Sequence, residues 1–146
     1  CFLIMDFNEM VRACWEAAKE FEASAYLLVA ESPAGLKFTR SVFHGVNNTS
    51  IIVACDSQGD TKVQEVDSPY MDCLPIKVPA KISQEESLTY LYDAHHGDDW
   101  ESVTFRKPLG PVPYNTLYIY TYSNERTGLV TYWAVDSTDG SVFQLF

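Results

Sequence analysis

The 146-residue chain has no long hydrophobic segment and few basic residues. Its longest uninterrupted apolar runs, such as residues 1–5, are far shorter than the ~20 residues that a membrane-spanning helix needs. Ten Lys and Arg residues stand against twenty Asp and Glu residues, which gives a formal charge of −10. A surface of this sign repels phosphate backbones, so we expect no membrane span and no nucleic-acid partner.

Motifs that carry catalysis or bind cofactors are also absent. The sequence has no Gly-x-Ser-x-Gly segment and no glycine-rich phosphate loop. Paired carboxylates such as Glu85-Glu86 are adjacent in sequence, so they diverge in space rather than face one substrate. A catalytic thiol would need a histidine base and an electropositive setting, which an acidic chain does not favour. We therefore expect a protein that is not an enzyme and that binds no cofactor.

Cysteine is scarce and its spacing matches no zinc site. The four cysteines are Cys1, Cys14, Cys55 and Cys73, with no C-x-x-C pair. An even number allows two disulfides by three connectivities. Alternatively, Cys14 and Cys55 are free thiols, because they occupy positions where the local patterns require small core residues.

Two features of the sequence bear on where in or outside the cell the protein is located. The chain begins at Cys1 without an initiator methionine, and removal of a secretory signal is one explanation. Residues 47–50 (NNTS) contain overlapping glycosylation sequons at Asn47 and Asn48, which matter only in a eukaryotic secretory pathway. We expect an extracellular, periplasmic or cell-surface location.

Two segments about eighty residues apart resemble each other. Residues 54–64 (ACDSQGDTKVQ) and 134–144 (AVDSTDGSVFQ) both predict a strand, a tight turn and a second strand. The Asp and Ser side chains can cap the turn, and the glycine tolerates a positive φ. Each half of the chain is therefore predicted to end in a β-hairpin.

Each half is also predicted to open with a helix. The first covers residues 6–22, with Asp6 or Asn8 as N-cap and apolar residues at every third or fourth position: Met10, Val11, Cys14, Trp15, Ala18 and Phe21. The second begins at Ser83, where Ser83 and Glu86 form a capping box, and it ends before Gly97.

The remaining pattern predicts eight strands and an α+β fold of two helix-plus-antiparallel-sheet repeats. The strands cover residues 25–31, 37–44, 50–56, 61–66, 102–107, 116–123, 128–136 and 141–146. The first repeat is residues 1–66, residues 67–80 form a proline-containing connector, and the second repeat is residues 81–146. Because neither half buries a sizeable core alone, the halves are expected to pack together or to extend one sheet.

The second half resembles the PepSY domain family. Residues 82–87 (ISQEES) resemble its I-S-x-E-E-A helix start, and residues 132–143 (YWAVDSTDGSVF) resemble its V-D-x-x-T-G-x-V hairpin. The first half departs from this pattern at residues 6–9 and at its turn glycine, Gly59. The tandem layout is also similar to that of β-lactamase inhibitor proteins and of cystatin-like folds. These resemblances imply an extracytoplasmic, non-enzymatic protein that binds or inhibits other proteins.

The candidate partner-binding site is aromatic. Alternation along residues 116–123 places Tyr118, Tyr120 and Tyr122 on one face, and Tyr132 on the next strand is predicted to join them. Tyrosine offers a large contact area at little entropic cost, so an exposed face of this kind suits a protein partner. Alternatively, the face packs against the first half, or its aromatic pairs stabilise the sheet.

Histidines and carboxylates gather in residues 93–100 (DAHHGDDW). His95, His96 and the neighbouring aspartates could in principle hold a divalent ion, but their spacing matches no metal signature. A polar helix end explains this composition, since histidine is favourable near the negative end of a helix dipole. We expect no metal.

The function predicted from the sequence is a non-catalytic, extracytoplasmic protein-binding or inhibitory module that uses the aromatic sheet face. Its expected partner is a basic protein, because the chain is acidic, or further copies of itself. An alternative is a structural subunit of a self-associating surface assembly. A small-molecule binder or hydrolase of cystatin-like shape would require a closed aromatic pocket. Self-association in solution distinguishes the first two.

Overall fold

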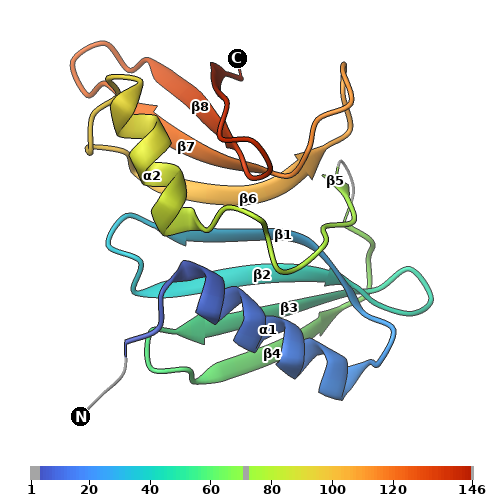
Figure 1. Ribbon diagram of the computed structural model, residues 1–146. Coiled ribbons are helices and arrows are strands. Elements are labelled where there is room, and N and C mark those ends of the chain that lie inside the picture. Colours follow the sequence, from blue (N-terminus) through green and yellow to red (C-terminus); the bar gives the residue numbers. More distant parts are fainter. Residues whose placement is uncertain (1–3, 71–72, 146) are drawn as a thin grey trace.

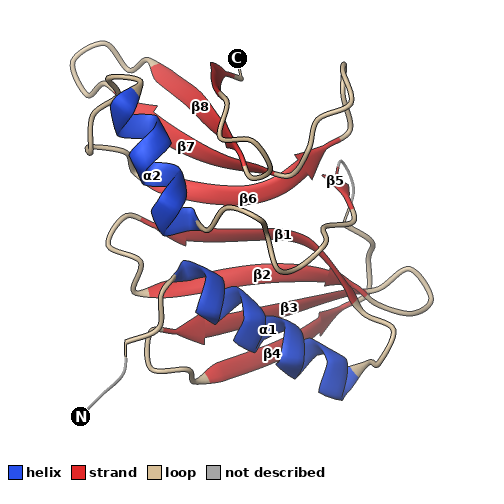
Figure 2. Cartoon of the chain, viewed as in Figure 1, coloured by secondary structure: helices blue, strands red, loops and turns tan. Residues whose placement is uncertain are grey.

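The computed structural model describes residues 4–70 and 73–145, and these residues build an antiparallel sheet with two helices on one face (Figures 1 and 2). The helices are α1 (Phe7–Phe21) and α2 (Gln84–Asp93). The strands are β1 (Tyr26–Pro33), β2 (Phe38–His44), β3 (Ser50–Asp56), β4 (Thr61–Val66), β5 (Cys73–Leu74), β6 (Ser102–Pro108), β7 (Leu117–Ser123), β8 (Val130–Asp136) and β9 (Val142–Gln144). In the described residues, no helix is long and apolar enough to cross a membrane.

Helix α1 forms where its amphipathic pattern and its cap agree. The Asp6 side chain accepts the Glu9 amide at 2.9 Å, and the Glu9 side chain accepts the Asp6 amide in return. Phe7, Met10 and Cys14 are completely buried on the inner face of the helix. This face packs mainly against β2 and β3, as the three-to-four residue spacing predicts.

Helix α2 is shorter and begins as its capping box predicts. The Ser83 hydroxyl accepts the Glu86 amide at 3.1 Å, and the Glu86 carboxylate accepts the Ser83 amide at 3.2 Å. The helix ends at Asp93 with Ala94 as its C-cap, and His95 follows with a φ of +69°. The helix therefore stops before Gly97, as the sequence predicts.

The hairpin turns also form as the repeated motif predicts. Asp56 Oδ1 accepts the amides of Gln58 and Asp60, and Asp136 Oδ1 accepts the amide of Thr138. Gly140 has a φ of +79°, a conformation that other residues rarely adopt. These turns join β3 to β4 and β8 to β9.

The predicted division into two helix-plus-sheet repeats is wrong. The strands form one continuous sheet in the order β4-β3-β2-β1-β6-β7-β8-β9, with β5 added beside β6. Its central junction is the antiparallel pairing of β1 with β6, from Val29 opposite Arg106 to Pro33 opposite Ser102. Helices and antiparallel strands are both present, so the α+β composition is confirmed, but a single sheet spans the molecule. Division of the chain into domains at residues 66 and 80 stays a prediction.

Part of the connector is built into the sheet. Cys73 and Leu74 form β5 and pair with Pro108 and Lys107 at the end of β6. Two residues later, the Ile76 amide donates to the Leu27 carbonyl of β1 at 2.9 Å. The chain thus occupies the place where β1 and β6 separate, and it then continues across the helix-bearing face toward α2 (Figure 1).

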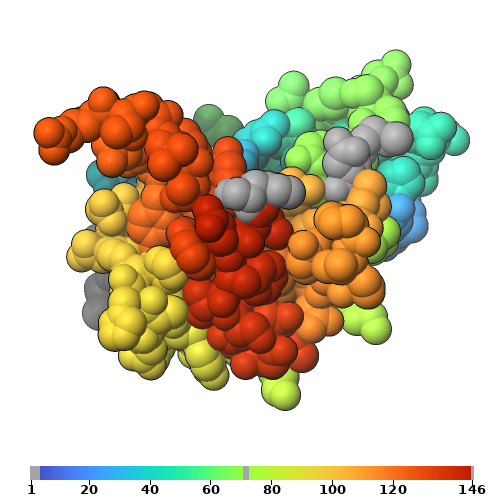
Figure 3. All heavy atoms as spheres, turned by 90° about the horizontal axis from the view of Figure 1, so that it is seen from above, coloured from blue at the N-terminus to red at the C-terminus, as the bar shows by residue number. Residues whose placement is uncertain are grey.

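The main core lies between the sheet and the helices. Its largest completely buried side chains come from α1 and from several strands: Phe7, Met10, Leu27, Phe43, Ile51, Phe105, Tyr118 and Tyr120. A second, smaller cluster forms around Leu117, Ile119, Ala134 and Leu145. The C-terminal residues contribute to it, and in the view from above they lie between α2 in yellow and the loop after β6 in orange (Figure 3).

Candidate functional site

Tyr118 and Tyr120 are core residues, so their predicted exposure is wrong. Both side chains are 0% exposed. The Tyr118 hydroxyl donates to the Ile82 carbonyl at 2.7 Å, and the Tyr120 hydroxyl lies 2.5 Å from Ser87 Oγ. Burial raises the pKa of Tyr120 to about 12 and also raises the pKa of Tyr118. Neither residue offers a surface to a partner, because their hydroxyls fasten α2 and the segment before it to β7.

The other two predicted site residues lie on opposite faces of the sheet. Tyr122 is opposite Thr131 in the β7–β8 register, on the same face as Tyr118 and Tyr120. Tyr132 is opposite Thr121, so it projects from the other face, where it is 37% exposed. The four tyrosines therefore do not form one platform. A role in partner binding stays a prediction for Tyr122 and Tyr132.

Residues 93–100, which contain His95, His96 and the neighbouring aspartates, make contacts that hold the structure together. His96 lies over Trp133 with ring centroids 3.9 Å apart, and the Tyr122 hydroxyl donates to the Gly97 carbonyl at 2.7 Å. Burial raises the pKa of Tyr122 above its ordinary value. Within residues 4–70 and 73–145, no group of three or more His, Cys, Asp or Glu side chains converges as metal ligands.

Cys14 and Cys55 are buried free thiols in the main core. The Cys14 Sγ donates to the Val53 carbonyl at 3.5 Å. Burial raises the pKa of Cys14, and burial together with the neighbouring Cys14 and Asp56 raises the pKa of Cys55 to about 11. The core positions predicted for these thiols are confirmed, and such thiols are poor nucleophiles at neutral pH. Cys1 lies outside the described residues.

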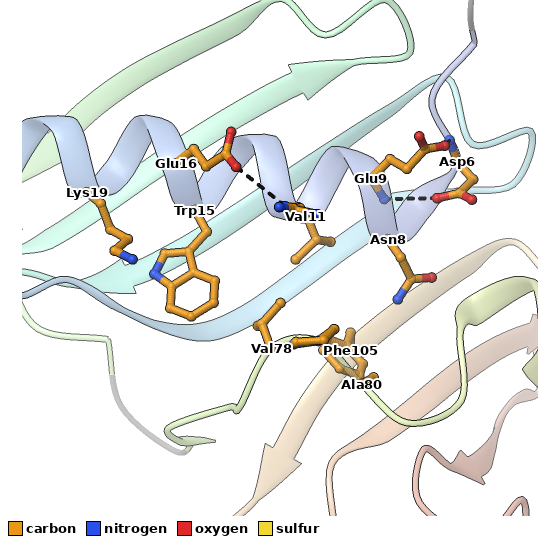
Figure 4. A pocket seen from close by; sticks show the side chains of 12 residues that line it. Asp6, Asn8, Glu9, Val11, Trp15, Glu16, Lys19, Val78, Ala80 and Phe105 are labelled. Carbon is orange, nitrogen blue, oxygen red and sulfur yellow. Dashed lines mark hydrogen bonds and ion pairs between the residues drawn. The ribbon is translucent and has the colours of Figure 1, made fainter.

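A groove between α1 and the connector is the feature that the sequence does not predict. It has a volume of about 650 Å³ and is bounded by α1 on one side, by Val78, Pro79 and Ala80 on the other, and by Phe105 of β6. Figure 4 shows Val11 and Trp15 projecting from α1 toward Val78 and Phe105. The floor of the groove is therefore apolar.

Charged side chains surround this floor. Arg12 Nε pairs with Glu16 at 3.4 Å, and both side chains are largely exposed. The Lys19 ammonium lies 4.7 Å from the centre of the Trp15 ring. The Trp15 Nε1–H is enclosed and has no hydrogen-bond partner. The indole donor is therefore not accessible, and Trp15 presents the apolar part of its ring to the groove. An aromatic ring at the edge of a groove favours contact with a ligand.

The three-to-four spacing predicts that the apolar residues of this helix form one buried stripe. This is correct for Cys14 and Ala18, but Phe21 is 52% exposed and Trp15 is not fully buried. Trp15 is only partly buried, because the connector approaches α1 without covering it completely. The path of the connector depends on its contacts with β1 and β6, which no local pattern in the chain encodes. An indole at the boundary of an apolar helix stripe is the signal that could have indicated this site.

The comparisons with known proteins define the class of fold and give no family. No protein-family model matches the chain, and no curated protein matches it. The PepSY resemblance is therefore not confirmed. A solved structure of a candidate lipoprotein from Clostridium difficile 630 shares the fold, with a TM-score of 0.64 and 15% sequence identity. The likeness covers 95% of this chain and 93% of that chain, so the two folds correspond over nearly their whole length.

Proposed function

We propose that the protein is a non-catalytic, extracytoplasmic protein-binding module whose recognition site is the groove between α1 and the connector. The observation that carries this proposal is the partly buried Trp15, whose ring projects from α1 into an open groove opposite Val78 and Phe105. At protein interfaces, much of the binding energy comes from a few anchor side chains that fill well-packed pockets of this kind. The tyrosine face is not used for this proposal, since Tyr118 and Tyr120 are buried.

The partner is a basic protein that inserts an apolar side chain onto the groove floor. The floor formed by Trp15, Val78 and Phe105 accepts an apolar group, and the whole chain carries a charge of −10. Asp6 and Glu9 lie at the end of the groove where α1 begins. Electrostatic attraction of this kind acts mainly on the rate of association and on the choice of partner.

An extracytoplasmic location is supported by the likeness to the candidate lipoprotein and by the PepSY-like segments. Both α2, which is capped by Ser83, and the hairpin between β8 and β9 form where those segments lie. In the family that they resemble, such domains bind or inhibit other proteins outside the cytoplasm.

Selection from a random peptide library displayed on phage tests the proposal. We expect immobilised protein to enrich peptides in which an apolar residue is flanked by Lys or Arg. A synthetic copy of an enriched peptide should bind Trp15→Ala at least roughly tenfold more weakly, because truncation of a buried aromatic anchor commonly costs more than 1 kcal/mol. Val78→Lys, which narrows the groove from its other side, should also weaken binding.

The matched control is Tyr132→Ser, which removes a half-exposed aromatic residue from the opposite face. It should bind the peptide as the unmodified protein does. Circular dichroism must show that each variant is folded. Equal binding by Trp15→Ala, or loss of binding in Tyr132→Ser alone, would contradict the groove as the site. Light scattering over a wide concentration range should give the mass of a single chain, whereas reversible growth in mass would support the structural-subunit alternative.

A further inference from the structure

A second hollow lies on the other side of Pro79 from the groove. It has a volume of about 250 Å³ and shares Pro79 and Ala80 with the groove as lining residues. Its remaining walls come from the connector and Lys81, the end of β6, the two residues before β7 and the turn after β8. The polar side chains that matter are Lys77, Lys81, Lys107, Asn115, Thr116 and Thr138.

The charge around this hollow is opposite to that of the whole molecule. Lys77, Lys81 and Lys107 line it together, although the chain has only ten basic residues against twenty acidic ones. No Asp or Glu lines the hollow. Among the described residues, the ion pairs are Arg12–Glu16 and Arg40–Glu31, so none of the three lysines is neutralised by a carboxylate.

Three lysines line one small hollow, so three like charges lie on the same part of the surface and repel one another. An anion that contacts all three removes this repulsion and gains charge-assisted hydrogen bonds. The arrangement is therefore more favourable when an anion is bound than when the hollow contains only water.

Neutral donors complete the lining. Asn115 Nδ2 donates to Asp136 Oδ2 at 3.0 Å, which leaves the second amide hydrogen of Asn115 for a ligand. Asp136 Oδ1 accepts the Thr138 amide at 2.7 Å, so both oxygens of this mostly buried carboxylate are engaged in holding the walls. The hydroxyls of Thr116 and Thr138 add further donors.

Backbone hydrogen bonds fix the walls relative to one another. The Ile82 amide donates to the Ser137 carbonyl at 2.8 Å, and the Ser137 amide donates to the Thr116 carbonyl at 3.0 Å. Lys107 is held on β6 by its pairing with Leu74 of β5. The lysine side chains are flexible, but the backbone positions from which they extend belong to ordered elements.

We propose that this hollow binds a phosphate group. A tetrahedral anion presents enough oxygens for three lysines and the neighbouring amide and hydroxyl donors at once. A volume of about 250 Å³ holds a phosphate and a small attached group, and it is too small for a folded partner. The source of the phosphate is a soluble phosphate ester or the headgroup of a phospholipid. The lysine, amide and hydroxyl side chains of this site do not line the groove, so the site does not depend on the proposed groove function.

Titration with inorganic phosphate, followed by the amide signals in ¹H–¹⁵N NMR spectra at constant ionic strength, tests the proposal. Shifts should saturate and should concentrate on residues 75–81, 107, 115–116 and 137–138. The Lys77→Gln/Lys107→Gln double variant should bind phosphate at least roughly tenfold more weakly, since it removes two charged donors. The matched control is Lys37→Gln/Lys62→Gln, which removes the same charge at exposed positions of the first half and should change the affinity less than twofold.

Vesicles distinguish the two sources of the phosphate. The protein is co-sedimented with vesicles of phosphatidylglycerol and phosphatidylcholine. If it co-sediments, and only the Lys77→Gln/Lys107→Gln variant loses this binding, the ligand is a phospholipid headgroup. Binding of inorganic phosphate without co-sedimentation assigns it to a soluble ester. Amide chemical shifts that do not saturate with phosphate would overturn the site. So would an equal loss of phosphate affinity in both double variants. Trp15→Ala should bind phosphate normally, so failure of the groove proposal and failure of this one are separate results.

Discussion

The side-chain oxygen of Asn8 accepts a hydrogen bond from the backbone amide of Gln84 at 2.7 Å. The amide group of the same residue donates to the Tyr118 hydroxyl at 3.0 Å. A residue in the first turn of α1 therefore satisfies a first-turn amide of α2, which has no partner within its own helix, and also contacts β7. This one carboxamide connects both helices to the sheet.

Loss of the Asn8 side chain should destabilise the fold. Asn8→Ala leaves the Gln84 amide without its partner in a partly buried place, which costs about 1–3 kcal/mol of the free energy of unfolding. Urea denaturation measures this change. Gln64→Ala, at an exposed position of β4, is the control and should change stability by less than about 0.5 kcal/mol. Equal effects of the two substitutions would show that the Asn8 contacts contribute nothing.

The buried tyrosines should make the protein sensitive to alkaline pH. Burial raises the pKa values of Tyr118 and Tyr120 above the ordinary value of 10.0, to about 12 for Tyr120. The unfolded chain therefore releases these protons first, so the free energy of unfolding is unaffected below pH 10 and falls as the pH rises from 10 toward 12.

Tyr118→Phe tests the origin of this fall. The variant should lose about 1–2 kcal/mol at pH 7, since the Ile82 carbonyl loses its hydrogen bond. It should then lose less stability than the unmodified protein between pH 10 and 11.5 in guanidinium denaturation. Tyr132→Phe, on the opposite face, is the matched control. An undiminished alkaline fall in Tyr118→Phe would mean that another group causes it.

Gly140 is required by its conformation and by its neighbour. An added Cβ would lie 2.4 Å from Cε1 of Tyr90, and the φ of Gly140 is +79°. Gly128 has a similar φ of +71° but has open space around its Cα. Gly128→Ala should therefore cost about 1 kcal/mol for the backbone conformation, and Gly140→Ala should cost about 1–3 kcal/mol more for the overlap. Thermal denaturation of the two variants measures the difference, and equal costs would show that Tyr90 moves aside freely.

The rate of thiol alkylation should differ between native and unfolded protein. With a pKa of about 11 instead of 9.0, Cys55 has about a hundredfold less thiolate at pH 8 than an ordinary cysteine. Iodoacetamide should therefore modify Cys14 and Cys55 in native protein far more slowly than in urea, and the Cys55 rate should rise with pH up to about 11. Peptide mapping by mass spectrometry measures the extent of alkylation at each cysteine. Rapid modification of both thiols in native protein, or a Cys14–Cys55 disulfide, would contradict the buried free thiols.

Local features of the fold could be predicted from the sequence because short-range chemistry determines them. Ser83 and Glu86 lie three residues apart and cap each other, and Asp56 and Asp136 each organise the turn that follows. The joining of the two groups of strands depends instead on Val29 meeting Arg106. No local pattern records which edges of two strand groups will pair, and this is why the two-repeat prediction failed.

The four tyrosines do not share one exposed face, for two further physical reasons. Alternation along β7 correctly groups Tyr118 with Tyr120, but it does not say which face the helices cover. The face assigned to Tyr132 depends on the register between β7 and β8, and a shift of one residue moves a side chain to the opposite face. The groove was missed because Val78 and Ala80 belong to a segment whose sequence indicates only a connector.

The pairing of β1 with β6 also determines the order in which the sheet can close during synthesis. β1 leaves the ribosome long before β6, so one edge of β1 has no partner until the C-terminal part of the chain has been made. That edge covers residues 29–33, and it begins with Val29 and Ala30, which are apolar and buried in the folded protein. A nascent chain that stalls before Ser102 therefore presents an open apolar strand, the form most prone to aggregate with other chains.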